Sequence, residues 1–340
     1  KNVAIGVSAL QTQNADVDTF NTAVGFNAGT AVTTGIQNTL IGGLAGDALT
    51  DADYNVGVGY NSLGANTVGS RNTAIGYNAL DAMNPSSATD TYNTAVGFYV
   101  GKDITTGIQN TIVGALAGDA MTTGSYNDAF GLNALSSNTS AQRNTAIGYG
   151  ALLAFNVTAN TDTYNTAVGN LAGTALTTGV RNTFVGGLAG DGTDDGVNNV
   201  AVGYGALSAN CTDNNTALGY GAGGSVESGG NVLIGTNTGV DTTALTSGQN
   251  NTLVGAFLRT DAADSDYCMG LGYNMQCAAG YTTLGAGNSD IRAAHGNVTW
   301  ATVSDERYKK DIVDSTAGLS FINALQPRTF KYKTLGELPE

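Results

Sequence analysis

The sequence has 340 residues and a formal net charge of −14, to which Asp contributes far more than Glu. No basic stripe accompanies this charge, so duplex nucleic acid and anionic membrane surfaces are poor candidates as partners. No apolar run of about eighteen residues occurs, which argues against a transmembrane helix and against membrane insertion. The three cysteines, Cys211, Cys268 and Cys277, form neither a disulfide framework nor a paired zinc motif. We predict no metal site and no cofactor.

A short phrase that runs from Asn21 to Gly25 organises most of the chain. Its copies begin at Asn2, Asn21, Asn38, Asn55, Asn72, Asn93, Asn110, Asn127, Asn144, Asn165, Asn182, Asn199, Asn215, Asn231 and Asn251. Most steps are equal, as from 21 to 38, 55 and 72, and such a fixed period marks a repeat architecture. The starts at 21, 93 and 165 are also evenly spaced, so four unequal copies form a larger unit, the four-copy unit.

The residues of the phrase alternate in character. The fourth position, Val24 in this copy, is apolar throughout, and this alternation favours a β-strand with one buried face. Asn before the strand and Gly after it suit turns, because both tolerate positive φ. A second short run follows, such as Tyr77 to Leu80, and then a polar turn. We therefore predict coils of two short strands and two turns, stacked in parallel about 4.8 Å apart.

The fold class predicted from these coils is all-β, a parallel β-solenoid of the β-roll type. The 49 Gly and only 3 Pro suit tight corners and unbroken ladders. A coil of this length encloses few apolar side chains, so we expect partner chains along the rod and an elongated homotrimer. Longer turns at 11–18, 81–91 and 153–163 recur near the period of the four-copy unit, and we expect them to project from one edge.

Taken in order, the chain divides into three parts. Residues 1–258 are the predicted rod, and residues 259–303 hold degenerate copies at 268–272 and 281–285 and a strand at 296–303. Residues 304–340 are charged at their start, with a short helix over 317–325 and a strand over 328–333, which predicts a small α+β domain. The sequence begins at Lys1 and stops within this last domain, so we expect a fragment or a processed product.

Two resemblances to known families add to these patterns. The repeats, over about 1–258, resemble the head repeats of trimeric bacterial adhesins, which form a parallel β-roll in a three-chain bundle. Residues 304–333, with SDERYKKDI and then GLSFINALQPRTFKYK, closely resemble the start of the endosialidase-type C-terminal intramolecular chaperone. That module occurs on phage tail fibres and tailspikes, where it helps three chains to fold in register and then cuts itself off.

The second resemblance implies a set of catalytic residues. Ser304 would be the nucleophile, Lys309 its base, and the cut would fall between Val303 and Ser304. A lysine can accept the proton of a hydroxyl when desolvation lowers its pKa. Without the resemblance, the same residues are typical of a helix-capping serine and a solvated lysine. The enzyme activity expected is therefore at most a single-turnover, autoproteolytic Ser-Lys peptidase.

Weaker signals leave alternatives open. Gly-x-Gly stretches such as 57–59 follow the coil period, which favours repeat geometry over a nucleotide loop. The column of Tyr and Phe after the Gly could stack sugars, but packing within or between chains is the commoner role. Asp clusters at 51/53, 194/195 and 261/264/266 could hold calcium, although solvated turns are favoured. His295 is the single histidine, which excludes a histidine-rich metal site within one chain.

The function predicted from the sequence is structural and adhesive. We expect the distal part of a phage tail fibre, extracellular on the virion, whose partners are two further copies and a host cell-surface receptor, with glycans among the candidates. A bacterial trimeric surface adhesin is one alternative. A glycan-cleaving tailspike is another, and it would need a pair of suitably spaced carboxylates.

Overall fold

The computed structural model describes residues 1–240, 244–287, 289–297 and 301–302. One compact unit, Lys1–Thr302, contains all of them. The predicted helix over 317–325 and strand over 328–333 lie outside the described residues. Among the described residues there is no helix that could span a membrane.

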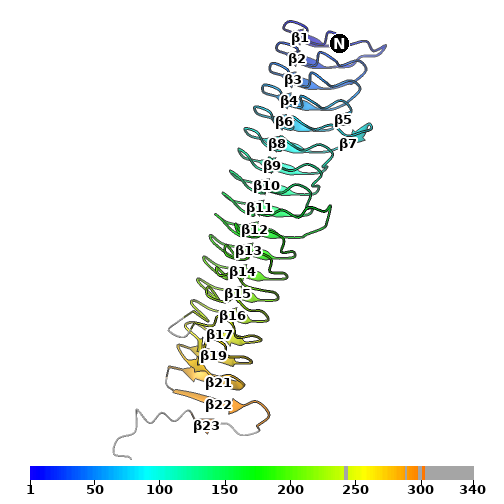
Figure 1. Ribbon diagram of the computed structural model, residues 1–340. Helices are drawn as coiled ribbons and strands as arrows, with labels where there is room; N and C mark the ends of the chain where they lie inside the picture. The colour runs from blue at the N-terminus through cyan, green and yellow to red at the C-terminus, as the bar shows by residue number, and fades with distance from the viewer. Residues whose placement is uncertain (241–243, 288, 298–300, 303–340) are drawn as a thin grey trace, which may run out of the picture. The chain divides into compact units, whose positions relative to one another are not determined.

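The unit is a stack of about 17 turns, each contributing a short strand to one sheet, as Figure 1 shows. The strands that pair in parallel are β1 (Val3–Ile5), β2 (Thr22–Val24), β3 (Thr39–Ile41), β4 (Val56–Val58), β6 (Thr73–Ile75), β8 (Thr94–Val96), β9 (Thr111–Val113), β10 (Asp128–Phe130), β11 (Thr145–Ile147), β12 (Thr166–Val168), β13 (Thr183–Val185), β14 (Val200–Val202), β15 (Thr216–Leu218), β16 (Val232–Ile234), β17 (Thr252–Val254), β19 (Met269–Tyr273) and β21 (Tyr281–Ala286). Equivalent positions face each other, for example Ala23 and Leu40. The predicted parallel solenoid is confirmed.

The direction of the strand side chains differs from the prediction. Ala23, in the middle of β2, is fully buried, whereas its neighbour Val24 is half-buried on the outside. Ile41, at the same position of β3, is 40% exposed. The prediction that the apolar fourth position of the phrase forms the buried face is therefore wrong. The third residue of the phrase, which is Ala in most copies but larger in Leu40 and Phe184, points into the interior, and the β-branched column faces outward.

The sequence predicts a second short strand in each coil, but in the regular coils the second run forms turns instead. Asn78 and Leu80 have φ values of 52° and 50°, in the left-handed region. The N–H of Asn78 donates to Tyr60 O in the preceding coil (3.0 Å), and that of Leu80 to Val100 O in the following one (3.2 Å). Alternate amides thus bond to opposite neighbours. These turns thus hydrogen-bond to both neighbouring coils while reversing the chain within a few residues.

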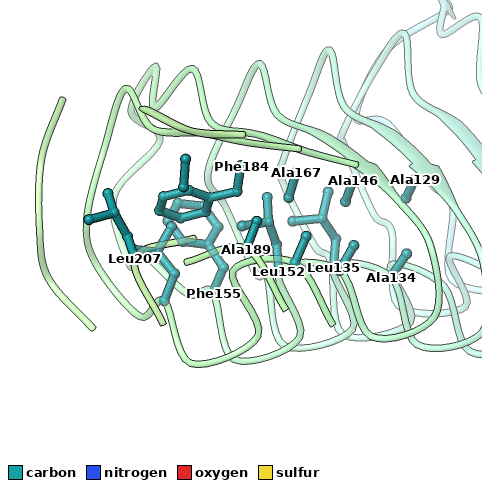
Figure 2. Close-up of a cluster of buried hydrophobic side chains, with 14 of the residues drawn as sticks. Ala129, Ala134, Leu135, Ala146, Leu152, Phe155, Ala167, Phe184, Ala189 and Leu207 are labelled. Atoms are coloured by element: carbon teal, nitrogen blue, oxygen red, sulfur yellow. The ribbon is translucent and has the colours of Figure 1, made fainter. Parts of the chain in front are cut away.

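The core side chains compensate one another in size. Phe184 at the centre of β13 faces Gly190, where an added Cβ would lie 2.6 Å from the ring. In the next coil the sizes are exchanged, because Ala201 is central and Leu207 fills the facing position. Figure 2 shows Phe184 in the row of smaller strand residues that includes Ala167. The two preceding four-copy units repeat the arrangement, with Leu40 against Gly46 and Ile112 against Gly118.

The interior of the stack is closed within a single chain. Its core side chains, from Ala23 to Leu253, are almost all fully buried without any partner. Exclusion of water therefore does not require other chains, contrary to the expectation, because neighbouring coils supply the cover. The homotrimer stays a prediction that has to rest on other features.

A ladder of buried asparagines runs beside the strands. The Asn110 Oδ1 accepts the backbone N–H of Asn127 at 2.9 Å, and the Asn110 Nδ2 donates to Gly124 O at 3.0 Å. The residue that adopts positive φ is Gln109, one place earlier, with φ 56°. The turn role expected for the Asn is therefore wrong. Its side chain instead pairs backbone groups of successive coils, which explains why Asn begins every copy.

The glycine after the strand has the conformation expected of it. Gly131 has φ 135°, and an added Cβ would lie 2.5 Å from the Gly148 carbonyl oxygen of the next coil. Both the backbone angle and the close approach therefore require Gly.

The parallel pairing of strands continues through the degenerate copies, and the strand direction then reverses. β19 and β21 extend the parallel sheet, whereas β22 (Ser289–Ala294) and β23 (Ala301–Thr302) pair antiparallel. Two further pairs, β5 (Gly69–Ser70) with β7 (Thr89–Asp90) and β18 (Arg259–Thr260) with β20 (Gln276–Cys277), lie outside the main sheet.

Candidate functional site

The residues predicted to carry out cleavage, Val303, Ser304 and Lys309, lie outside the described residues. The candidate sites that the structure presents are therefore surfaces of the rod.

The acidic turns bond to backbone amides of neighbouring coils. Asp53 Oδ1 accepts the N–H of Ile36 at 2.8 Å, and Asp213 Oδ1 accepts that of Val197 at 2.8 Å. In the described part of the chain, no group of three or more His, Cys, Asp or Glu side chains is placed to hold a metal ion. These carboxylates cap the open amides of the turns. His295 contacts Thr282 Oγ1 through its Nε2 at 3.3 Å.

One long face of the rod is apolar. It is formed by the outward residues of the strands, of which the more exposed are Ile5 (60%), Ile41 (40%), Ile75 (37%), Ile147 (39%), Leu218 (47%) and Leu271 (55%). Two residues farther along the coil, many copies carry a Tyr or Phe, and these residues form an aromatic column. Tyr60, Tyr77 and Phe98 stack there with ring centroids 5.5 Å apart, and Tyr204 stacks on Tyr220 at 5.8 Å. We call these two columns together the apolar face.

The aromatic column remains largely exposed. Tyr77 is 42% exposed and Phe98 51%, although each stacks on a neighbour. Stacking within the chain therefore covers only part of each ring. Exposed apolar residues that recur along so many coils are typical of an interaction site rather than of a monomer surface.

A different edge of the rod carries a recurring polar cluster. Arg71 Nε donates to Asp90 Oδ2 at 2.9 Å, and the Tyr92 hydroxyl donates to the same carboxylate oxygen at 3.2 Å. The guanidinium lies over the ring of Tyr54 at 4.5 Å and near that of Tyr92 at 5.8 Å. The hydrogen bond to Asp90 raises the pKa of Arg71 above its ordinary value. The arginine is therefore held as a cation between two aromatic rings.

The same cluster returns in the next four-copy unit with nearly identical geometry. Arg143 Nε lies 2.8 Å from Asp162 Oδ1, and the Tyr164 hydroxyl lies 3.1 Å from Asp162 Oδ2. The guanidinium lies 4.6 Å from the Tyr126 ring centroid and 5.9 Å from that of Tyr164. Two separate stretches of sequence thus form the same arrangement of an arginine, an aspartate and two tyrosine rings.

A third version occurs in the first coils. Lys1 Nζ lies 2.8 Å from Asp18 Oδ2 and 5.5 Å from the ring centroid of Phe20. We call the three groups the triads: Lys1–Asp18–Phe20, Arg71–Asp90–Tyr92 and Arg143–Asp162–Tyr164. In Figure 1 the longer loops at the N-terminal coils, at β7 and between β11 and β12 leave the rod on the same side. We refer to this side, which bears the triads, as the triad edge.

A polar pocket lies farther along the same column of residues. Thr212, Asp213, Asn214, Gly229, Gly230, Gln249 and Asn250 line it, with a volume of about 270 Å³. Asn214 and Asn250 occupy the position that Arg71 holds in its own coil, directly before the ladder asparagine. The triad edge therefore continues as a polar surface toward the C-terminal coils.

The triads were not predicted from the sequence, although a signal was present. The segments DTFN, DTYN and DTYN occur at 18–21, 90–93 and 162–165, at the ends of the long turns. An Arg precedes the ladder asparagine one coil earlier in the second and third cases. The shared Asp-Thr-aromatic ending of the long turns is therefore the sequence signal for the triads.

The cysteines are buried and do not form a surface site. Burial raises the pKa of the Cys211 thiol. A hydrogen bond between Cys268 and Cys277 lowers the pKa of Cys277 and raises that of Cys268, and Cys268 Sγ also lies 3.4 Å from Cys277 O. The side chains of all three lie inside the stack.

Comparison with known proteins bears on the C-terminal part of the chain. Residues 304–339 match the family model described as chaperone of endosialidase. This confirms the resemblance inferred from SDERYKKDI and the Gly-Leu-x-Phe-Ile segment, and it leaves the repeats unmatched by that model. No curated protein and no solved structure matches the chain.

Proposed function

We propose that this chain is part of a phage tail fibre or tailspike, a rod that three copies form together along their apolar faces. Residues 304–340 would belong to the chaperone that starts this assembly. The observation that carries the proposal is the presence, in one chain, of a regular solenoid and a segment matching the endosialidase chaperone family.

The regularity of the rod creates the need for such a chaperone. β2, β8 and β12 have the same sequence, Thr-Ala-Val, and occupy the same place in successive four-copy units. Two chains that slip by four coils would therefore bring identical or similar outward residues together again, such as Val96 in place of Val24 and Ile147 in place of Ile75. A slipped pairing keeps many of its contacts, so the rods alone specify their register weakly. A terminal domain that trimerises first would remove this ambiguity.

Self-cleavage is the second element of the proposal. Ser304 would attack the carbonyl of Val303, and Lys309 would accept the hydroxyl proton and pass it to the Ser304 nitrogen as the Val303–Ser304 amide bond breaks. Water would then hydrolyse the resulting ester, so that the chaperone leaves after the rods have paired. Release of the folding agent would make the assembled state kinetically trapped. The remaining rod would be extracellular on the virion and would contact a host cell-surface receptor.

The experiment that tests cleavage is intact-mass measurement of the full-length product under denaturing conditions. We expect the wild type to show a rod ending at Val303 and a separate C-terminal fragment. The Ser304→Ala variant should show one uncleaved chain, whereas the matched control Ser315→Ala should be cleaved like the wild type. Equal masses for the wild type and Ser304→Ala would remove the peptidase role.

Assembly is tested separately by sedimentation. The full-length chain should be a trimer, and a chain ending at Val303 before folding should give monomers or aggregates. Well-formed trimers from the shortened chain would contradict the register argument. Monomers from the full-length chain would overturn the proposed fibre.

A further inference from the structure

The triads present hydrogen-bonding groups that the fold leaves at the surface. Among the described residues, Arg71 uses its Nε for Asp90, and its side chain is 40% exposed while that of Asp90 is 46% exposed. Tyr92 is 50% exposed beside them. The two arginine triads therefore offer guanidinium donors, carboxylate and hydroxyl acceptors and an aromatic ring within one small area, and the Lys1 triad offers an ammonium, a carboxylate and a ring. This combination suits a ligand with several hydroxyl groups and apolar C–H faces.

The charges of the triads favour an uncharged ligand over an anionic one. An arginine paired with an aspartate is neutral overall, and the chain as a whole carries −14. A polyanion would be repelled at long range and would have to compete with Asp90 and Asp162 for the guanidinium groups. An uncharged polyol meets neither obstacle.

The spacing of the triads indicates an extended ligand. The second and third triads are four coils apart, which at the strand separation of a sheet is about 19 Å. A linear polymer lying along the rod would meet the same constellation at regular intervals. Simultaneous contacts raise the overall affinity well above that of one contact, provided that the ligand spans them.

We propose that the triad edge binds a neutral, linear polysaccharide that lies along the rod and contacts successive triads. The inference rests on the proposed attachment role and names the part of the rod that would perform it. The triads precede the strands whereas the aromatic column follows them, so the triads and the aromatic column lie at opposite ends of each strand. Association centred on the aromatic column would thus leave the triad edge accessible.

The test measures binding of the full chain to immobilised polysaccharides by bio-layer interferometry. The probes are a linear α-glucan, a β-glucan, a galactan and a mannan, with polygalacturonate as an acidic comparison. The variant is Arg71→Ala with Arg143→Ala. The matched control is Arg181→Ala, because Arg181 occupies the same column but donates its Nε to Asn198 Oδ1 at 2.8 Å instead of to a carboxylate.

We expect at least one neutral polymer to bind the wild type and Arg181→Ala equally, and the double variant at least tenfold more weakly. Short oligosaccharides of the same polymer should bind at least tenfold more weakly than the polymer itself. If the double variant does not fold, Tyr92→Leu with Tyr164→Leu replaces it, since that pair keeps both ion pairs.

Three binding results would overturn the inference. They are no binding to any neutral probe, binding to polygalacturonate alone, and unchanged binding by the variants. Loss of the trimer in the double variant would also overturn it, by making the triad edge a contact between chains. Sedimentation of the wild type separates these results from a failure of the proposed function, because a trimeric rod that binds no glycan contradicts only this inference.

Discussion

Replacement of one ladder asparagine provides a sharp test of what holds successive coils together. Asn110 is fully buried. Asn110→Ala would leave the N–H of Asn127 without its acceptor and Gly124 O without its donor. An orphaned buried backbone group costs about 1–3 kcal/mol, so the two together predict a loss of roughly 2–6 kcal/mol. The control Asn170→Ala makes the same change at an exposed position and should stay within about 0.5 kcal/mol of the wild type.

The assay combines guanidinium denaturation with amide hydrogen exchange. A solenoid is stabilised by contacts between neighbouring coils, so the damage should be greatest in the coils next to the substitution. The Asn127 amide should lose its protection, while the Thr111 amide, which donates to Asn127 O at 2.9 Å, should lose less. If Asn110→Ala and Asn170→Ala denature at the same midpoint, the ladder does not stabilise the stack as argued.

Three further predictions concern the core, the acidic turns and the apolar face. Phe184→Ala should lower the unfolding free energy by about 3–5 kcal/mol. Adding Gly190→Leu should recover part of this loss, because the next coil has the same pair of residues in Ala201 and Leu207. If denaturation shows no recovery in the double variant, the size compensation is refuted. Burial raises the pKa of the Asp119 carboxyl above its ordinary value. The folded chain therefore binds a proton at Asp119 more tightly than the unfolded chain does. As a result, the rod should gain stability as the pH falls through the raised pKa. Asp119→Asn should lack this gain when denaturation midpoints at pH 7 and pH 4 are compared, and an unchanged pH response would contradict the assignment. Ile147→Asp should convert trimers to monomers in sedimentation, whereas Thr178→Asp, an exposed change elsewhere, should not; intact Ile147→Asp trimers would place the contact away from the apolar face.

The sequence was sufficient to predict the stacking but not the direction of the side chains. The fixed period and the Asn–Gly boundaries led to a parallel solenoid with the strands in the right places. Val24 and its equivalents were assigned to the core because apolar residues are usually buried. The strands instead direct the third residue of the phrase inward, Ala23 in one copy and Phe184 in another, and the alternation of a strand then places Val24 and its equivalents outside.

The role of the asparagines could not be predicted from local conformational preference. Asn tolerates positive φ, so its place before a strand suggested a turn. In the stack, Asn38 Nδ2 donates to Ala52 O, and its Oδ1 accepts the N–H of Asn55, bonds that exist only between coils. The triads were missed for a related reason, because Arg71 and Asp90 come together only after one coil is laid on the next.

The antiparallel turn at the end of the ladder determines how the rod can grow. Beyond β21, the next hydrogen-bonding edge is occupied by β22, which runs the opposite way. β23 in turn pairs antiparallel with β22, so the edge of β21 is covered by the chain itself. Another coil of the same kind cannot pair directly with β21, and within the described residues end-to-end polymerisation through the edge of β21 is therefore blocked.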